Sequence, residues 1–521
     1  MTTSKDVSHI RRRVSFVQGM IGNLRAEAFS RSSGGSVYIV ISRTTLAAQH
    51  LAQKDEALTG SASAIAAEED ALLELENRVC SHGDTVHYAK RPKIFEHCEG
   101  SYLYDRQETS YLDLQMWYSA VNLGYGNQRV NDALKVQIDR LPQLACQYLH
   151  REKVELASMI VDSVEHAFAE KGRVHFNVGG SQAIEDALKL VRKHTGKSHQ
   201  LAYEGGYHGR TLGASAITSS YRYREPFGEF GDRAEFIPFP YCFRCPYGKK
   251  PDSCALYCVE QIERKFEHEY TGIWNPKTGR SEFGAFFIEV VQGTGGYIGA
   301  PKGYFERLAK LLKEHGILLV DDEIQMGFFR TGKLWAAENF QIKPDIMVFG
   351  KALTNGLNPL SGIWAREELI SPERFGPGST HSTFSSNSLG TAAGLEVMKI
   401  FAEGDYEKTV PEKGAYFLNL LKELQGKHPE IGDVDGLGLA LRMEMCEKDG
   451  YTPSRNLADK MFQRGLEGNL KVNGKKMGLV LDIGGYYKNV VTLAPSLEIS
   501  YPEMDLAHDL LDLLITECKK G

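Results

Sequence analysis

The stretch "PDIMVFGKALTNG", which runs from Pro344 to Gly356, places a lysine directly after an apolar run. Residues 346–350 are mostly apolar, and Lys351 separates them from a break rich in glycine and asparagine. Charged side chains avoid the protein interior unless they are paired. Lys351 is therefore either a strand-end lysine that reaches water, the commoner case for a single lysine, or a buried amine with a chemical role.

Apolar runs of similar length occur elsewhere in the chain, and helical patterns such as "SQAIEDALKLVRKHTG" (181–196) and "KGYFERLAKLLKEHG" (302–316) separate them. The runs are "RVHFNV" (173–178), "QLAYEG" (200–205), "AFFIEVV" (285–291) and "GILLVDD" (316–322). Short apolar runs that alternate with helical stretches predict a parallel sheet with crossover helices, which is the α/β class.

Glycines or polar residues follow four of the predicted strands, counting the run before Lys351. In chain order they are Gly179, Gly180 and Ser181; then Glu289; then Asp321, Asp322 and Glu323; and finally Lys351. Ligands of open α/β sheets bind at the carboxyl ends of the strands. The pattern therefore predicts a site at which glycines, carboxylates and an amine meet at one edge of the sheet.

The glycine-rich turn before Ser181 opens a predicted helix, and a helix N-terminus binds anions. Taken alone, an ordinary strand–helix turn is the commoner interpretation. Of Asp321 and Asp322, strand alternation lets only one face the site. An anion site, a buried carboxylate and a strand-end lysine together match what pyridoxal 5′-phosphate requires, namely a phosphate cradle, an acid at the ring nitrogen and a lysine for the aldehyde.

From about Val86 to the C-terminus, the chain resembles the class III aminotransferases, which are fold type I pyridoxal-phosphate enzymes. The motifs that carry the resemblance are, in order, "GGSQAIEDALKL", "YEGGYHGRTLG", "VDDEIQMGFFRTG", "PDIMVFGKALTNG" and "THSTFSSNSLG". The resemblance implies a large domain with a mostly parallel seven-stranded sheet flanked by helices, together with a smaller α+β domain.

We expect four segments on this basis. Residues 1–80 form a mostly helical N-terminal extension, 81–130 the first part of the small domain, 131–403 the large cofactor-binding domain and 404–521 the rest of the small domain. The Ala/Leu-rich helices of the extension need an apolar partner surface to be stable. We therefore expect the extension to wrap a dimer and not to catalyse.

The resemblance also implies roles for residues around the cofactor ring. Lys351 matches the lysine that holds the cofactor as a Schiff base and moves protons during the reaction. Asp322 matches the acid at the ring nitrogen. Ile324 would pack on one face of the ring, Tyr207 would stack on the other, and Gln325 would approach the ring hydroxyl.

Further residues are expected around the phosphate and the rim of the site. Gly180 and Ser181 would donate hydrogen bonds to the phosphate. Thr383 matches a threonine that reaches the phosphate bound by the neighbouring subunit, which implies a homodimer with shared active sites. Glu289 would lie near the substrate. His208 would be a structural neighbour of the stacking tyrosine and not a base.

On the substrate side, Trp117 and Tyr118 follow a strand-like segment and could equally line the pocket or belong to the core. Thr294 and Thr492 stand where the amino-acid-handling branch of the family has a glutamate and its paired arginine. Their presence predicts a neutral pocket that tolerates uncharged or bulky amines and aldehydes.

Arg442 is the candidate for binding a substrate carboxylate, although an exposed strand arginine fits its pattern better. The alternative is that another arginine replaces the missing one and glutamate remains the donor.

The expected activity is ping-pong transfer of an amino group from an amine or amino acid to an aldehyde or keto acceptor. An amino-acid racemase, epimerase or aminomutase would use the same lysine and aspartate and stays open as the alternative. A binding protein on an inactive scaffold is disfavoured, because Lys351, Asp322 and the phosphate turn are all present. The sequence fixes neither donor nor acceptor.

The composition argues against nucleic-acid and membrane partners. The net charge of −6 indicates neither nucleic acid nor a membrane surface, and no apolar run reaches the length of a membrane span. The N-terminus lacks a secretory pattern, and nine cysteines are expected as reduced thiols of a cytoplasmic protein. Zinc-like spacing joins Cys242, Cys245, Cys254 and Cys258, but we expect packed thiols there and no metal.

Overall fold

The computed structural model describes residues 62–84, 87–228, 230–231, 234–267, 270 and 273–520. The chain divides into one unit that ends at Cys80 and a second that begins at Ser81. Within the first unit, α3 (Ala62–Val79) is a helix, as its alanine, leucine and glutamate content favours. The part of the predicted helical extension before residue 62 lies outside the described residues.

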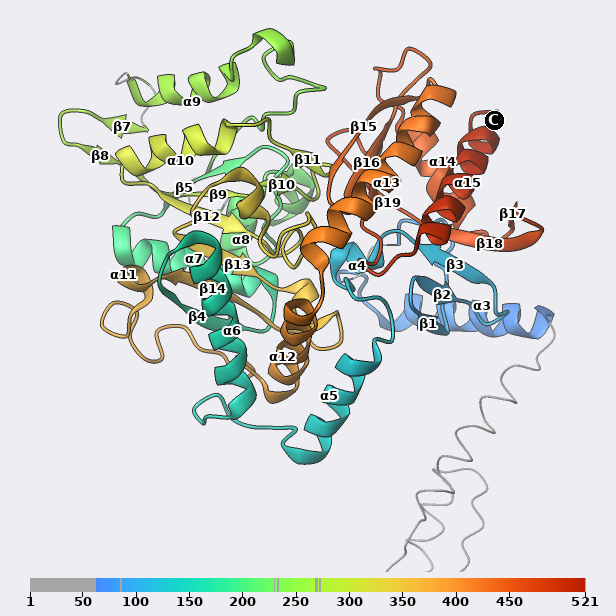
Figure 1. The fold of residues 1–521 in the computed structure, drawn as a ribbon, viewed down its shortest axis with the longest axis horizontal. Helices are drawn as coiled ribbons and strands as arrows, with labels where there is room; N and C mark the ends of the chain where they lie inside the picture. The colour runs from blue at the N-terminus through green and yellow to red at the C-terminus, as the bar shows by residue number, and fades with distance from the viewer. Residues whose placement is uncertain are drawn as a thin grey trace, which may run out of the picture. The chain divides into compact units, whose positions relative to one another are not determined.

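A seven-stranded sheet lies at the centre of the described part of the second unit (Figure 1). Its strands, in spatial order, are β4 (Gly172–Asn177), β14 (Ser361–Arg366), β13 (Ile346–Phe349), β12 (Leu318–Asp322), β9 (Phe283–Ile288), β5 (His199–Tyr203) and β6 (Ala234–Ile237). Only β14 among them runs antiparallel, to both β13 and β4. The predicted α/β fold with a mostly parallel sheet is confirmed.

Both faces of this sheet are covered, which explains why its strands are continuous apolar runs. Alternate residues enter two separate cores: Phe286, Leu319 and Met347 belong to one, and Phe287, Val320 and Val348 to the other. The second core also receives the apolar stripe of α7 (Gly180–Thr195).

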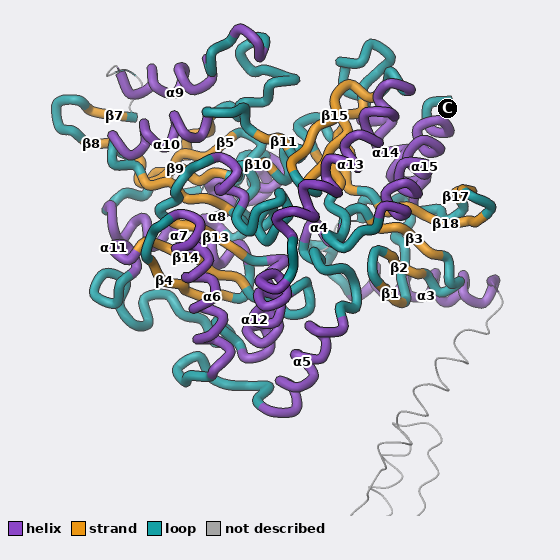
Figure 2. The backbone as a smooth tube through the Cα atoms, viewed as in Figure 1, coloured by secondary structure: helices purple, strands orange, loops and turns teal. Residues whose placement is uncertain are grey.

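Helices enclose the strands on both sides (Figure 2). They include α6 (Arg151–Phe168), α8 (Leu212–Ile217), α9 (Tyr257–Glu267), α10 (Tyr304–Glu314), α11 (Glu367–Ile370) and α12 (Ser388–Glu403). A further helix, α5 (Gln128–Arg140), packs against α12. None of the described helices is long and apolar enough to cross a membrane.

Two smaller sheets are built around the C-terminal segment. One is antiparallel, with strand order β15 (Ile431–Leu437), β16 (Ala440–Met445), β20 (Val490–Leu493) and β19 (Asp482–Gly484). The other joins β1 (His97–Glu99), β2 (Tyr102–Tyr104) and β3 (Ser110–Asp113) to β18 (Lys475–Val480) and β17 (Leu470–Val472). The helices α13 (Tyr406–Lys427), α14 (Arg455–Gly465) and α15 (Tyr501–Cys518) accompany them.

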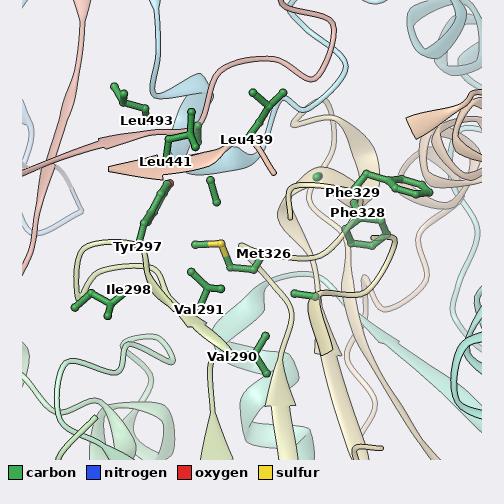
Figure 3. Close-up of a cluster of buried hydrophobic side chains, with 14 of the residues drawn as sticks. Val290, Val291, Tyr297, Ile298, Met326, Phe328, Phe329, Leu439, Leu441 and Leu493 are labelled. Carbon is green, nitrogen blue, oxygen red and sulfur yellow. The ribbon is translucent and has the colours of Figure 1, made fainter. Parts of the chain in front are cut away.

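Apolar side chains join the loops beyond the large sheet to the C-terminal strands. Met326 and Phe328 from the segment after β12 lie in one buried cluster with Leu439, Leu441 and Leu493 (Figure 3). The fully buried guanidinium of Arg330 crosses the same junction and donates to the carbonyl oxygens of Leu439 and Pro495, at 3.1 and 2.6 Å. This junction holds the C-terminal strands against the edge of the large sheet.

Candidate active site

The carboxyl ends of β9, β12 and β13 lie side by side at one edge of the large sheet. In the parallel register, Asp322 lies beside Val348 of β13, and Asp321 lies beside Ile288 of β9. Glu289 directly follows β9, and Lys351 follows β13 after one residue. Strand pairing therefore places a glutamate, an aspartate and a lysine on three neighbouring strand ends.

Lys351 is a partly buried lysine that lines a cavity of about 360 Å³. Its backbone has a φ of 43°, a left-handed conformation that is costly for a residue other than glycine and is typical of functional sites. The amine makes no hydrogen bond or ion pair with the described residues. Burial lowers the pKa of Lys351, and the charges of Asp322, Glu289 and Asp482 offset this only in part. Lys351 is therefore a cavity-lining lysine with a lowered pKa and not an ordinary surface lysine.

Asp322, and not Asp321, is the member of the acidic pair whose charge acts on Lys351, although it does not itself line the cavity. Its Oδ2 lies 2.8 Å from Nδ1 of His208, and its Oδ1 accepts the backbone N–H of Ile324 at 3.1 Å. Burial by itself lowers the pKa of His208, but the hydrogen bond and charge of Asp322 outweigh it, so that the pKa is raised. His208 thus holds the carboxylate in place through a contact between residues 114 positions apart, which no local sequence pattern predicts.

Asp321 lies on the opposite face of β12 and is fully buried beside Glu323. The Glu323 carboxylate accepts the backbone N–H groups of Ala336 and Ala337 at 2.9 and 2.8 Å. Burial and the adjacent Glu323 raise the pKa of Asp321 well above its ordinary value. The surroundings of Asp321 therefore favour its protonated form, and this residue belongs to the interior and not to the cavity lining.

The start of α7 offers a site for an anion. No side chain caps its first turn, so its leading N–H groups remain free for a ligand. A Cβ atom on Gly180 would come within 2.8 Å of Ile324 Cδ1, so a larger residue here would displace the end of the Ile324 side chain. The Ser181 hydroxyl accepts the backbone N–H of Arg210 at 3.2 Å.

Glu289 forms hydrogen bonds with two loops at the rim of the cavity. Its Oε1 accepts the backbone N–H of Tyr207 and its Oε2 that of Gly293, each at 2.9 Å. Tyr207 and Gln325 both line the cavity, and Gln325 donates to the Tyr297 hydroxyl at 2.9 Å. Glu289 thus positions the cavity wall and is not part of its lining.

The two aromatic candidates for the substrate pocket, Trp117 and Tyr118, differ in where their side chains lie. They belong to the short turn α4 (Met116–Ser119), in which all four residues have a positive φ, between 44° and 66°. Four consecutive left-handed residues other than glycine represent stored strain, which is characteristic of functional sites. Tyr118 lines the Lys351 cavity, whereas the Trp117 side chain is 57% exposed and packs against the backbone of Gly356.

Arg442 lies outside this site. It is 2% exposed and forms ion pairs with Asp433 and Glu444, and it lines a different cavity together with Tyr241 and Asp435. The expectation of an exposed strand arginine was wrong, because residues on both faces of β16 are buried.

The two threonines occupy different positions. Thr294 lines the cavity, whereas Thr492 is buried behind Asp482 and donates its hydroxyl to Asp482 Oδ2 at 2.7 Å. Asp482 and Lys488 both line the cavity, so the neutral pocket that the threonines predict is wrong for this cavity. Asp482 ends the apolar run "MGLVL", the same signal that singled out Asp322, and that signal could have found it.

The four-cysteine loop is a group of partly buried thiols. Burial raises the pKa of Cys242, and it raises that of Cys258 to about 11. Within the described residues, no three of the four sulfurs lie within 4.8 Å of one another. All nine cysteines of the chain are free thiols.

The arrangement fits pyridoxal 5′-phosphate. The uncapped start of α7 suits the phosphate, the Asp322 carboxylate suits the ring nitrogen, and the unpartnered Lys351 amine suits the aldehyde. The cavity that contains Lys351 also includes Tyr207 and Gln325 as walls for a flat ring. Four separate segments of the chain thus supply complementary groups to one cofactor.

Comparison with known proteins agrees with this geometry. The family model for class III aminotransferases matches residues 85–515. The leucine/methionine racemase of Thermococcus litoralis is 31% identical over 86% of this chain and 96% of its own. The 4-aminobutyrate aminotransferase of Escherichia coli is 29% identical over 82% of this chain and 95% of its own.

Solved structures show the same fold. An S-selective transaminase from an Arthrobacter species, with alanine bound, superimposes with a TM-score of 0.76 at 25% identity, and the match covers 87% of this chain and 98% of that one. The chain therefore belongs to the class III aminotransferase family, and it is a pyridoxal 5′-phosphate-dependent aminotransferase.

Proposed function

We propose that Lys351 is the catalytic residue of this aminotransferase and that Asp322, held by His208, is its partner at the cofactor ring. The observation that supports this most directly is the unpaired amine of Lys351 at the strand end beside Asp322. The donor gives up its amino group and leaves as a carbonyl product before the acceptor binds, which is the ping-pong order.

Pyridoxal 5′-phosphate, when bound, supplies an aldehyde for the donor amine and a ring that accepts electrons as a proton leaves. The Lys351 Nζ takes the proton from the carbon that bears the nitrogen and returns it on the cofactor side. Its lowered pKa favours the neutral amine, which is the form that acts as a base. Asp322 stabilises a proton on the ring nitrogen, and the start of α7 holds the phosphate.

The half-reaction with an amino donor alone tests this function. We expect the holoenzyme, mixed with a reactive amine and no acceptor, to convert its cofactor to pyridoxamine phosphate in one equivalent per site. A panel of donors against pyruvate and 2-oxoglutarate would then identify the pair of substrates. Absorbance and chromatography of the released cofactor are the measurements.

Racemisation is the second candidate, because the Thermococcus relative is a leucine/methionine racemase. A racemase exchanges the α-proton and returns the same amino acid with its configuration inverted. Inversion of L-leucine or L-methionine, with the cofactor left in the aldehyde form, would contradict the proposed amino transfer.

A homodimer with shared sites is part of the proposal. Thr383 is exposed, and the adjacent Phe384 side chain is 69% exposed, which is unusual for a large apolar residue. Leu149 and Tyr148 are also exposed. We propose that this apolar surface meets a second copy and that Thr383 reaches that copy's phosphate. With nine free thiols, the reducing cytoplasm is the proposed compartment.

Changing Phe384 to aspartate is expected to shift the protein from dimer to monomer and to lower cofactor retention, because a charge would be buried in the proposed interface. Analytical ultracentrifugation measures the first effect and cofactor content after dialysis the second. Tyr270→Asp, at a residue that is 90% exposed, is the matched control and should stay dimeric. A Phe384→Asp variant that remains a full dimer would place the interface elsewhere.

A further inference from the structure

Asp482 puts a carboxylate into the wall of the same cavity as Lys351. It begins β19 and lies opposite Thr492 of β20 in the strand register. Thr492 donates its hydroxyl to Oδ2 at 2.7 Å, and the Gln115 side chain also hydrogen bonds to this carboxylate. These contacts hold Asp482 in one orientation without neutralising its charge.

No lysine or arginine among the described residues lies within ion-pairing distance of Asp482, although an isolated carboxylate in a partly buried site is unfavourable. Lys488, in the same cavity, attracts it but forms no ion pair with it. Burial lowers the pKa of Lys488. Burial raises the pKa of Asp482, and the hydrogen bonds from Thr492 and Gln115 and the charge of Lys488 oppose this shift. A cationic group of the substrate beside Asp482 would favour the ionised carboxylate.

Four aromatic rings line the cavity together with this carboxylate, and the charged side chains of Asp84 and Arg210 also belong to its wall. Tyr88, Tyr118, Tyr207 and Tyr223 all contribute to the cavity. Such rings pack well against methylene groups, and their faces attract cations. An aliphatic chain that ends in a positive charge would match both the tyrosines and the carboxylate.

We propose that Asp482 is a specificity-determining residue that binds a second ammonium group of the amino donor. The reacting amine lies at Lys351, and the far end of the donor, across an aliphatic chain, forms a charge-assisted hydrogen bond with Asp482. Thr492 acts through Asp482 as a positioning residue. This inference rests on the proposed function, because it concerns the donor of the same reaction.

The competing arrangement uses Lys488 in place of Asp482. Lys488 would then bind a carboxylate at the far end of the donor, and Asp482 would serve only to orient the loop that carries Lys488. The two arrangements favour opposite charges at the same end of the donor. Three donors of equal chain length separate them: 1,5-diaminopentane, pentylamine and 5-aminopentanoate.

The test measures kcat/KM for discharge of the holoenzyme cofactor by each donor. We expect the wild type to prefer 1,5-diaminopentane to pentylamine by roughly ten- to a hundredfold, as a hydrogen bond to a charged group provides. Asp482→Asn keeps an acceptor for Thr492 but removes the charge, and should bring this ratio close to one. The same variant should improve 5-aminopentanoate relative to pentylamine, because repulsion from the carboxylate is lost.

Two further variants separate a specific role from a general disturbance. Asp435→Asn makes the same chemical change at an exposed residue that lines a different cavity, and should keep the wild-type ratio. Thr492→Val should lower the ratio in part, because Asp482 loses its fixed orientation. Cofactor content and Tm of each variant show whether it is folded.

Equal kcat/KM for 1,5-diaminopentane and pentylamine in the wild type would overturn the inference, and so would an unchanged preference in a folded Asp482→Asn variant. A wild type that prefers 5-aminopentanoate, with that preference lost in Lys488→Gln, would establish the competing arrangement. If no donor discharges the cofactor of the wild type, the proposed function fails, and the failure is not specific to Asp482.

Discussion

Replacing Lys351 with alanine is expected to lower kcat by roughly three or more orders of magnitude, because one amine takes the proton from the donor carbon and returns it. The structure offers no substitute at this position. The other cavity amine, Lys488, comes from the loop after β19 and not from the end of β13. The yellow colour of the bound cofactor should change as well, since the protein loses the amine that binds the aldehyde.

Lys351→Arg provides the matched comparison. It keeps a positive charge at the same position, but a guanidinium does not lose its proton near neutral pH. We expect it to be nearly as inactive as Lys351→Ala, which would show that a titratable amine is required and not a charge. A small amine added to the solution should restore part of the lost rate in Lys351→Ala, measured in single turnovers. Near-normal turnover by Lys351→Ala would contradict the assignment.

Much of the large domain could be predicted because its central strands obey one strong physical rule. The strands β5, β9, β12 and β13 are covered on both faces, so each is a continuous apolar run that ends in polar residues. That rule located Glu289, Asp322 and Lys351 at one edge. It missed β14, an antiparallel strand inserted beside β13, and β6, a short strand at the edge of the sheet.

The features that could not be predicted from the sequence depend on contacts between segments that are distant along the chain. The pairing of β3 with β18 joins residues more than 360 positions apart, and no local pattern records it. Arg442 was expected to be exposed because alternation in a strand does not reveal whether its polar face is covered. The contact of His208 with Asp322 and that of Thr492 with Asp482 are likewise set by the packing of loops and strands.

The two adjacent aspartates are expected to respond in opposite ways to the same substitution. Asp322→Asn should lower kcat by roughly a hundredfold or more, because the ring nitrogen loses its counter-charge while the bulk of the side chain is preserved. Asp321→Asn should be mild, because burial beside Glu323 favours the protonated form of Asp321, and an amide can likewise donate a hydrogen bond toward Glu323. Steady-state kinetics of both variants with one donor–acceptor pair is the measurement.

The pH dependence of the stability of the folded protein provides an independent test of the two aspartates, Asp321 and Asp322. Burial beside Glu323 raises the pKa of Asp321 in the folded state, so folding favours its protonated form. The stability that this residue contributes is therefore fully present below its unfolded pKa of about 4 and is lost as pH rises toward the raised folded value. Asp321→Asn removes that dependence and should gain Tm relative to the wild type as pH increases from about 4. If Asp321→Asn abolishes activity and Asp322→Asn is mild, the cofactor lies on the face of β12 that carries Asp321 and not on the face that carries Asp322.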